Sequence, residues 1–304
     1  MSSFFSLSES SSTSDIRKPI CPNLPDLDLS ISKDWIEKSK TNDFSSRNPI
    51  FTGPSSESNW VIKPNLLVGA YPNMTRNIHK TNVIQEGILN EGITTFISLN
   101  AEYGKDYGHP AYAIDTEDTD TEVKSLYGTK GIKKIARELS KEEPKFELFE
   151  IVDMNVATDD NLLIFCENLK QKLCNDEKLY IHCTGGHGRT GTVVAILLYM
   201  LYNIEPNDAF NYIQYAHDQR EDNIFGSGYY STLITDSDQG KFVMGQVPTP
   251  QTQAQRDQVI RIVNILKQSS SVKSAEGGKR KTKTNRKRRT TKKKKTQKRK
   301  FYKK

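Results

Sequence analysis

The residues best suited to chemistry lie in one run, His182-Cys183-Thr184-Gly185-Gly186-His187-Gly188-Arg189-Thr190-Gly191. Glycines in a tight turn let successive backbone N–H groups point inward and form a nest for an anion. The start of a helix at the same place favours negative charge, including the thiolate of Cys183, which would be a strong nucleophile. The planar guanidinium of Arg189 fits two oxygens of a phosphate. Residues 183–189, here called the Cys183 loop, therefore predict nucleophilic attack on phosphorus, with the phosphate bound by Thr184, Gly185, Gly186, His187, Gly188 and Arg189.

Alternating strands and helices are predicted to position this loop. The loop follows a predicted strand at 178–182 and precedes an apolar helix at 190–202. Further strands are expected within 59–72, with a break at Pro64, and at 94–99 and 146–152. Further helices are expected at 83–89, 132–139, 159–173, 205–220 and 253–267, and a short one near 33–40. This order predicts an α/β fold with a central, largely parallel sheet flanked by helices.

The run from His182 to Gly191 resembles the Cys-x5-Arg signature of the cysteine-dependent protein tyrosine phosphatases. The likeness covers about residues 59–268, because Trp60-Val61-Ile62 and Leu66-Leu67-Val68-Gly69 look like the opening of dual-specificity-type phosphatase domains. The resemblance implies a tyrosine-phosphatase-like fold with Cys183 as the nucleophile. It implies a mechanism that needs no metal and no cofactor.

The resemblance also implies a general acid, which in this family is an Asp upstream of the Cys. Asp153 lies thirty residues before Cys183, at the end of the predicted strand 146–152, where open α/β sheets place their sites. Asp159 and Asp160 are alternatives, but their position before an apolar-periodic run favours helix capping. The family usually has a Pro near this Asp, whereas here Met154 follows.

Three other residues receive roles from the resemblance. Gln251-Thr252-x-x-Gln255 is similar to the Q-loop and implies that Gln251 positions the hydrolytic water, although the start of a helix explains the same residues. His182 resembles the family's hydrogen-bond partner of the loop, with a satisfied core histidine as the alternative. Thr190 would place a hydroxyl near the sulfur of Cys183, and helix capping would select it equally.

His187 bears on the substrate. Lipid phosphatases of this superfamily carry Lys at this place in the loop, so the loop here lacks the added positive charge that phosphoinositide head groups favour. The sequence therefore favours a phosphoprotein substrate.

The four cysteines, Cys21, Cys166, Cys174 and Cys183, show no paired short spacing. They predict neither a disulfide framework nor a zinc site, and they favour an intracellular, reducing compartment. Cys166 and Cys174 fall on a helical stripe and are expected to pack in the core. The longest apolar run, 193–202, is too short to cross a bilayer.

Both ends of the chain are predicted to be disordered. Residues 1–58 are rich in Ser and show little periodicity. The tail 269–304 is strongly basic; the part from Lys273 carries 18 Lys and Arg against one acid, which leaves a net charge of −10 for the rest. Such a tail is typical of nuclear localisation or of binding to nucleic acid or another polyanion, and the alternative is a solubilising end. Its composition resembles endings on proteins of giant DNA viruses.

The sequence is compatible with three functions. The first is a protein phosphatase of the dual-specificity type that acts on phosphotyrosine, with activity on phosphoserine or phosphothreonine left open. The second is an RNA 5′-phosphatase of the mRNA-capping kind, which would use the basic tail; those enzymes typically lack the Asp acid. The third is a non-catalytic phosphate-binding module, which the combination of Cys183, Arg189 and Asp153 disfavours.

Overall fold

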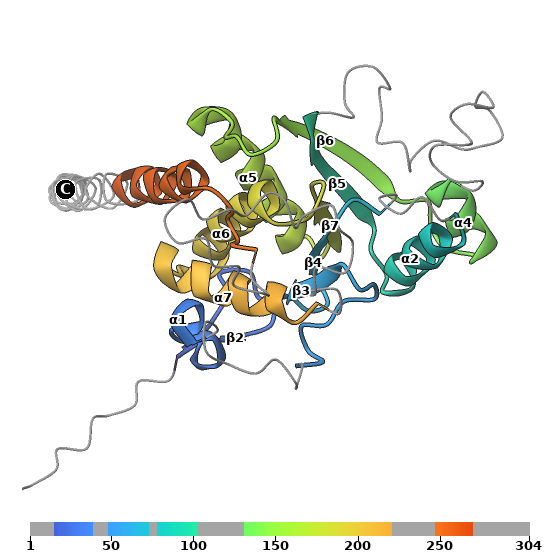
Figure 1. The fold of residues 1–304 in the computed structure, drawn as a ribbon, viewed down its shortest axis with the longest axis horizontal. Helices are drawn as coiled ribbons and strands as arrows, with labels where there is room; N and C mark the ends of the chain where they lie inside the picture. Colours follow the sequence, from blue (N-terminus) through green and yellow to red (C-terminus); the bar gives the residue numbers. More distant parts are fainter. Residues whose placement is uncertain (1–14, 39–47, 73–77, 102–130, 221–246, 270–304) are drawn as a thin grey trace, which may run out of the picture. The chain divides into compact units, whose positions relative to one another are not determined.

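A computed structural model describes residues 15–38, 48–72, 78–101, 131–220 and 247–269 (Figure 1). Its strands are β1 (Ile16–Arg17), β2 (Leu27–Asp28), β3 (Ser58–Ile62), β4 (Leu66–Gly69), β5 (Thr95–Asn100), β6 (Lys145–Ile151) and β7 (Leu179–His182). Its helices are the 3₁₀ turn η1 (Ser30–Ser32), α1 (Trp35–Lys38), α2 (Ile78–Asn90), α4 (Ile132–Glu138), α5 (Asp159–Cys174), α6 (Gly188–Tyr202) and α7 (Pro206–Asp218), and residues 253–269 are also helical.

The main sheet confirms the predicted fold class. Within the described ranges it has five strands in the order β3-β4-β7-β5-β6. β3 runs antiparallel to β4, and every other neighbouring pair is parallel. β7 lies in the middle, where His182 is in register with Gly69 of β4 and Ser98 of β5. The chain therefore leaves the centre of the sheet at its carboxyl edge, directly into the Cys183 loop.

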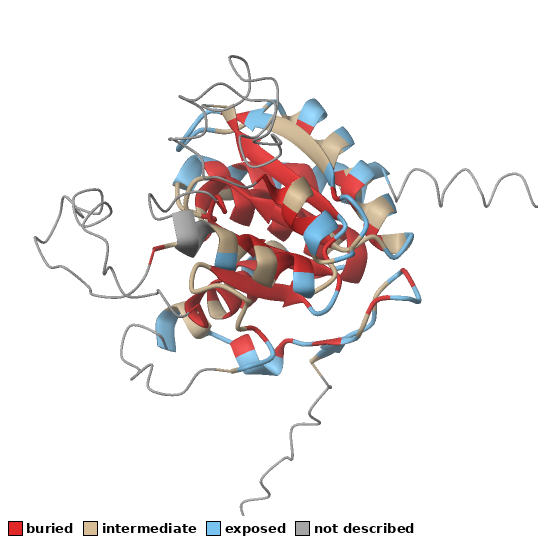
Figure 2. Cartoon of the chain, turned by 90° about the vertical axis from the view of Figure 1, so that its right-hand side faces the viewer, coloured by how far each residue is buried: buried red, intermediate tan, exposed pale blue. Residues whose placement is uncertain are grey.

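Helices cover both faces of this sheet. On one face, side chains of α2 and α4 form a buried cluster with side chains of β3, β4, β5 and β7 and of two connecting segments. Its members are Trp60, Leu67, Tyr71, Ile88, Leu89, Ile93, Phe96, Ile132, Ile135, Ala136 and Tyr180. In Figure 1, α5, α6 and α7 lie on the other side. α6 is buried along almost its whole length, as expected for a helix that is apolar all round. Figure 2 shows the buried residues concentrated in the sheet and these central helices.

The start of α5 differs in detail from the sequence prediction. Thr158 is the N-cap, and its side chain accepts a hydrogen bond of 3.4 Å from the backbone N–H of Asn161. Asp159 and Asp160, the predicted caps, lie in the first turn instead. Carboxylates in the first turn stabilise a helix through its macrodipole. Aspartate therefore suits the first turn as well as the N-cap.

The N-terminal segment also corrects a prediction, because residues 15–38 and 48–58 are ordered and packed. β1 and β2 form an antiparallel pair, and the backbone N–H of Ile20 donates to the carbonyl of Leu201 on α6 at 2.8 Å. Phe51 is buried with its ring edge-on to Tyr212 and Tyr215 of α7. The predicted disorder up to residue 58 is therefore wrong for these residues. The short helix expected near 33–40 is present as α1.

A disulfide joins Cys21 of this segment to Cys174 at the end of α5, across a sequence separation of 153 residues. The prediction that the cysteines do not pair is wrong for these two. The core-packing prediction holds for Cys166, which is free and fully buried. Short-range spacing cannot reveal a pair so distant in sequence; the fold brings the two Cα atoms to 5.2 Å.

The predictions of disorder for residues 1–14, 39–47 and 270–304 fall outside the described residues. Contacts divide the chain into one unit that ends at Val259 and a second that begins at Ile260. Of the helices in the described ranges, none has the length and apolar character that a membrane span requires.

We predict that Cys174→Ser lowers the free energy of unfolding of the oxidised protein by about 2–5 kcal/mol, because the bond restricts the unfolded chain over a long loop. Urea unfolding monitored by circular dichroism measures the loss. Cys21→Ser should cause the same loss, since it removes the same bond, and the double variant should lose no more. In reducing buffer the free energy of unfolding of the wild type should equal that of the variants. If the wild type and the variants have the same free energy of unfolding in both buffers, the bond does not stabilise the fold.

Candidate active site

The Cys183 loop begins where β7 ends, at the centre of the sheet, and leads into α6 at Gly188. Cys183 is a free cysteine with 3% of its surface exposed. It lies at the carboxyl edge of parallel strands and just before a helix N-terminus, where partial positive charge gathers. The structure thus places the predicted nucleophile where an anion is favoured.

Gly186 lets the loop turn tightly over the end of β4. Its φ is +73°, in the region that favours glycine. A Cβ at this position would collide with the carbonyl group of Gly69 and lie 2.9 Å from the backbone nitrogen of Ala70. The loop and the end of β4 can approach this closely only because residue 186 has no side chain.

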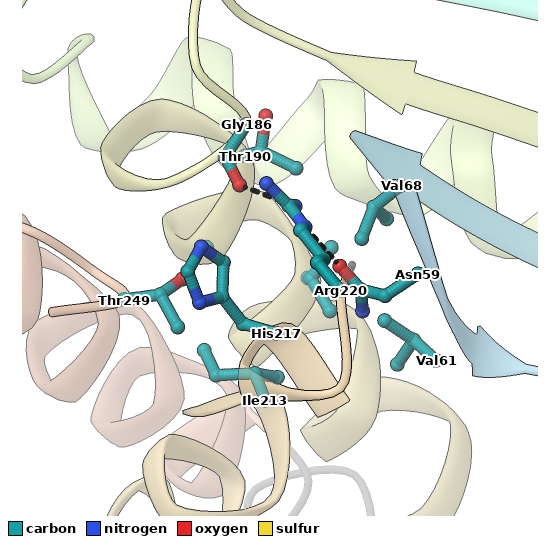
Figure 3. A pocket seen from close by; sticks show the side chains of 11 residues that line it. Asn59, Val61, Val68, Gly186, Thr190, Ile213, His217, Arg220 and Thr249 are labelled. Carbon is teal, nitrogen blue, oxygen red and sulfur yellow. Dashed lines mark hydrogen bonds between the residues drawn. The ribbon is translucent and has the colours of Figure 1, made fainter. Parts of the chain in front are cut away.

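Arg220 binds the Cys183 loop through the carbonyl groups of the loop (Figure 3). Its Nη1 and Nη2 each donate a hydrogen bond of 3.0 Å, to the carbonyls of Gly185 and Gly186, and its Nε donates to Asn59 Oδ1 at 2.7 Å. Because a trans peptide points its N–H opposite to its carbonyl, this clamp turns the N–H groups of Gly186 and His187 away from Arg220. Burial lowers the pKa of Arg220 to about 10, which still leaves it charged at neutral pH. Sequence analysis did not single out Arg220, since one arginine at a helix end carries no local signal.

Arg189 connects the loop to the predicted acid. Its Nη1 donates to the carbonyl of Ile151 at the end of β6, and its Nη2 donates to Thr184 Oγ1, both at 2.9 Å. Nη2 also forms a salt bridge of 2.9 Å with Asp153 Oδ1. The Arg189 side chain is 1% exposed, whereas that of Asp153 is 67% exposed. The structure therefore brings Arg189, Thr184 and Asp153 together around one guanidinium, with the carboxylate on the solvent side.

The segment after Asp153 turns without a proline. Met154 adopts a left-handed conformation with φ of +59°, and the N–H of Asn155 donates to the carbonyl of Val152 at 3.0 Å. The carbonyl of Asn155 then accepts a hydrogen bond of 3.2 Å from Gln255 Nε2. A turn and a distant glutamine thus shape the segment in which the family usually has a proline.

The Gln251 to Gln255 segment is compatible with both interpretations that the sequence left open, a Q-loop and the start of a helix. Gln255 accepts from the N–H of Thr252 at 3.0 Å, and its own N–H donates to Thr252 Oγ1 at 3.2 Å, which is a capping box. The segment nevertheless lies beside the Cys183 loop, because a Cβ on Gly188 would be 2.8 Å from Gln255 Oε1 and 3.2 Å from Gln251 Cβ. The water-positioning role of Gln251 stays a prediction, and Gln255 is an additional residue that links this segment to Asn155.

His182 is fully buried, and its ring contacts the rings of Tyr71 and Tyr180, each at a centroid distance of 5.6 Å. Burial lowers its pKa to about 3; a hydrogen bond with the backbone of Cys183 partly opposes this, and the charge of Arg189 adds to it. The side chain is therefore neutral at physiological pH. Its contact with Cys183 suits the predicted partner of the loop, and its burial suits a core histidine equally.

Thr190 lies buried in the first turn of α6, and its Oγ1 has no hydrogen-bond partner among the described residues. No hydrogen bond from it to the Cys183 sulfur is seen, so its role in thiolate departure remains a prediction. Thr190 lines a cavity of about 10 Å³ behind the loop, together with His217, Arg220 and Thr249 (Figure 3). This is about the space that one water molecule needs.

Comparison with known proteins identifies the domain. Residues 55–224 match a family model described as "Swiss Army Knife protein, DSP-PTPase phosphatase domain". The chain belongs to this family. Its DSP-PTPase domain contains the main sheet, the Cys183 loop and Asp153, whereas Gln251, Gln255 and the segment 15–38 lie outside the matched residues.

Two curated relatives of the DSP-PTPase domain come from viruses. "Putative tyrosine phosphatase 197R" of Invertebrate iridescent virus 6 is 37% identical over 81 residues, which are 25% of this chain and 30% of that protein. "Putative tyrosine phosphatase 067L" of Invertebrate iridescent virus 3 is 48% identical over 44 residues, 14% of this chain and 18% of that protein. The matches thus span less than a third of either relative. Their origin fits the viral origin that the tail suggested.

Among solved structures, the crystal structure of Tk-PTP in the active form is similar with a TM-score of 0.41 and 12% identity. The match covers 68% of this chain and 97% of that one.

We predict that Gly186→Ala disrupts the loop, because a β-carbon would meet the backbone of Gly69 and the positive φ strains any other residue. Affinity for vanadate, measured by calorimetry, should fall at least about 10-fold, which corresponds to about 1.4 kcal/mol, because the N–H groups of the loop would no longer point at the anion together. Gly87→Ala on α2 is the matched control, because its new Cβ would lie 3.2 Å from Pro54 O and far from the loop in sequence. Equal vanadate affinity in the two variants would contradict the geometry described for Gly186.

Proposed function

We propose that this domain hydrolyses phosphotyrosine in proteins, with phosphoserine and phosphothreonine as secondary candidates, through a cysteinyl-phosphate intermediate. The observation that carries the proposal is the arrangement around Arg189, which contacts the Cys183 loop through Thr184 and the predicted acid Asp153 at the same time. A phosphate in the loop would lie between a nucleophile, a guanidinium and a carboxyl group.

The first step forms a bond from the Cys183 sulfur to phosphorus and breaks the bond from phosphorus to the leaving oxygen. Loop N–H groups and Arg189 stabilise the charge on the remaining phosphate oxygens. Asp153 gives its proton to the leaving oxygen. In the second step, water attacks phosphorus, Asp153 takes a proton from it, the bond to sulfur breaks, and inorganic phosphate leaves. Gln251 is proposed to orient this water.

The buried histidines support the choice of Asp153 as the acid. A proton donor has to be protonated at the working pH, and the lowered pKa of His182, about 3, keeps it neutral. Burial, with the nearby His217 and Arg220 in addition, lowers the pKa of His187 well below the ordinary value. Neither imidazole therefore takes the charged imidazolium form, in which a histidine acts as a general acid, at neutral pH.

The neutral His187 also bears on the substrate. The position that carries Lys in lipid phosphatases holds no charge here, so the loop offers one guanidinium and backbone N–H groups to a phosphate. That set is suited to a single phosphomonoester. It supports a phosphoprotein substrate over a polyphosphorylated head group, and Asp153 supports it over an RNA 5′-triphosphate.

The basic tail is proposed to hold the protein on a polyanion such as nucleic acid, through counterion release. Chemistry and localisation would then reside in separate parts of the chain, since the groups proposed for catalysis lie between Asp153 and Gln251.

The test of the proposed function is release of phosphate from matched phosphotyrosine and phosphothreonine peptides and from RNA 5′-triphosphate, without divalent metal. We expect the phosphotyrosine peptide to be hydrolysed fastest. Preference for RNA would overturn the proposal in favour of the capping-type activity, and binding of all three without turnover would indicate a phosphate-binding module.

We predict that Cys183→Ser abolishes turnover of para-nitrophenyl phosphate while the affinity for inorganic phosphate is kept, because the thiolate forms the covalent bond whereas Arg189 and the loop N–H groups bind the ion. Cys166→Ala is the matched control, since Cys166 is the other free cysteine and lies in the core. Its turnover per folded molecule should equal the wild type. Turnover by Cys183→Ser at the wild-type rate would exclude the covalent mechanism.

We predict that Asp153→Asn slows hydrolysis of an aryl phosphate with a poor leaving group by about 10²- to 10⁴-fold, the usual contribution of a positioned acid. A substrate with a good leaving group should be affected far less, and the fall in rate at alkaline pH should disappear. Stopped-time assays over pH with both substrates measure this. Asp159→Asn is the control, because Asp159 Oδ1 accepts a hydrogen bond from Gln258 and belongs to α5. If Asp159→Asn shows the larger loss of rate with the poor leaving group and Asp153→Asn does not, the assignment of the acid is wrong.

A further inference from the structure

A chain of hydrogen bonds runs from the N-terminal segment to the Cys183 loop. Trp35 Nε1 of α1 donates to Asp218 Oδ2 at 2.8 Å. Asp218 Oδ1 lies 3.2 Å from His217 Nδ1, and His217 Nε2 lies 2.7 Å from Nδ1 of His187 in the loop. Figure 3 shows His217 on the wall of the cavity behind the loop, beside Thr249. Four side chains thus join α1, α7 and the loop.

The chemistry of these groups fixes the direction of the hydrogen bonds. The carboxyl group of Asp218 is fully buried and also accepts from Gln214 Nε2 at 2.9 Å. Because a carboxylate only accepts, His217 Nδ1 donates to it, and His217 Nε2 is then an acceptor when the ring is neutral. Burial and the charge of Arg220 lower the pKa of His217 well below the ordinary value, so the ring is neutral. His187 Nδ1 must therefore be the donor, which sets one tautomer for both rings.

The chain ends on a residue whose backbone is also held. The carbonyl of His187 accepts from Thr249 Oγ1 and from the N–H of Gly191, both at 2.9 Å. His187 is the N-cap residue of α6 and lies two residues before Arg189. The position of the His187 ring therefore affects where the loop joins α6. It also affects the backbone position of Arg189, and with it the position of the guanidinium group.

The first member of the chain comes from outside the phosphatase domain. Trp35 lies in the segment 15–38, whereas the family match covers residues 55–224. Its indole ring packs edge-on against Tyr215 of α7 at a centroid distance of 4.9 Å. A second hydrogen bond between the same two helices, from the N–H of Ile36 to Asn211 Oδ1 at 3.0 Å, does not lead to the loop.

We propose that Trp35, Asp218 and His217 are positioning residues that hold His187 in one tautomer, and that the N-terminal segment thereby contributes to the order of the phosphate-binding loop. The proposal rests on the proposed function for its kinetic consequence. Its structural consequence, the state of the His187 ring, can be measured without any activity.

The main test compares Trp35→Phe, which keeps an aromatic ring but removes the N–H, with Asn211→Ala, which removes the hydrogen bond from α1 that lies off the chain. Substitutions along such networks change coupling by roughly 0.5–2 kcal/mol, which is about 2- to 30-fold. We expect Trp35→Phe to lower kcat for para-nitrophenyl phosphate within this range, with KM little changed, and Asn211→Ala to leave kcat unaltered. Equal losses of kcat in Trp35→Phe and Asn211→Ala would mean that any contact that anchors α1 has the same effect. That result would overturn the proposal.

A second readout separates positioning from loss of structure. Imidazole nitrogen shifts in NMR report which nitrogen of His187 is protonated. We expect Nδ1 in the wild type and in Asn211→Ala, and a growing share of the Nε2 tautomer in Trp35→Phe and in Asp218→Asn. Unchanged shifts in both chain variants would refute the proposal.

A double variant tests whether Trp35 acts through Asp218. Because the two residues share one pathway to the loop, Trp35→Phe combined with Asp218→Asn should lose no more kcat than Asp218→Asn alone. Strictly additive losses would show that the two residues act independently. A wild type without any phosphatase activity would instead sink the proposed function, and the NMR comparison would still decide the positioning chain.

Discussion

The candidate active site depends on keeping two arginine side chains, Arg189 and Arg220, charged inside the protein. Each is almost fully buried, and moving a cation out of water costs several kcal/mol unless polar groups replace its hydration. Arg220 obtains three acceptors, two of them loop carbonyls, and lies near the charge of Asp218. Arg189 obtains a carbonyl, a hydroxyl and the exposed carboxylate of Asp153. The same contacts that solvate the two cations therefore also shape the loop and bring Asp153, the proposed acid, to it.

Asp153 is the exposed partner of Arg189, and its exposure matters for the proposed mechanism. Asp153 is bound to the guanidinium from the solvent side, so a phosphate that enters the loop competes with it for Arg189 Nη2. In the proposed mechanism the phosphate takes over this contact, and the carboxyl group of Asp153, released from the guanidinium, then protonates the leaving oxygen. The proposed mechanism thus joins binding of the substrate to release of the proposed acid, because both anions would use the same cation.

The parts of the site that are close in sequence could be predicted, and the parts that depend on distant contacts could not. The strand and helix on either side of Cys183 follow from apolar periodicity, and the position of Asp153 follows from the end of a predicted strand. Arg220 gave no signal, because what makes it special is the approach of two loop carbonyls more than thirty residues earlier in the chain. The order of residues 15–38 was missed for a similar reason. Their composition predicts disorder, but a disulfide and hydrogen bonds to α6 and α7 supply order that no local pattern contains.

His187 shows how one loop position can serve either the substrate or the scaffold. A charged side chain facing the ligand would add affinity for a second phosphate group. In this chain the ring instead turns inward and bonds to His217, in an environment that keeps both imidazoles neutral. A neutral inward ring cannot attract an additional phosphate, but it ties the loop to α7 and, through Asp218, to Trp35. Histidine at this position thus adds no charge to the loop and, at the same time, links the loop by hydrogen bonds to a segment outside the matched residues 55–224.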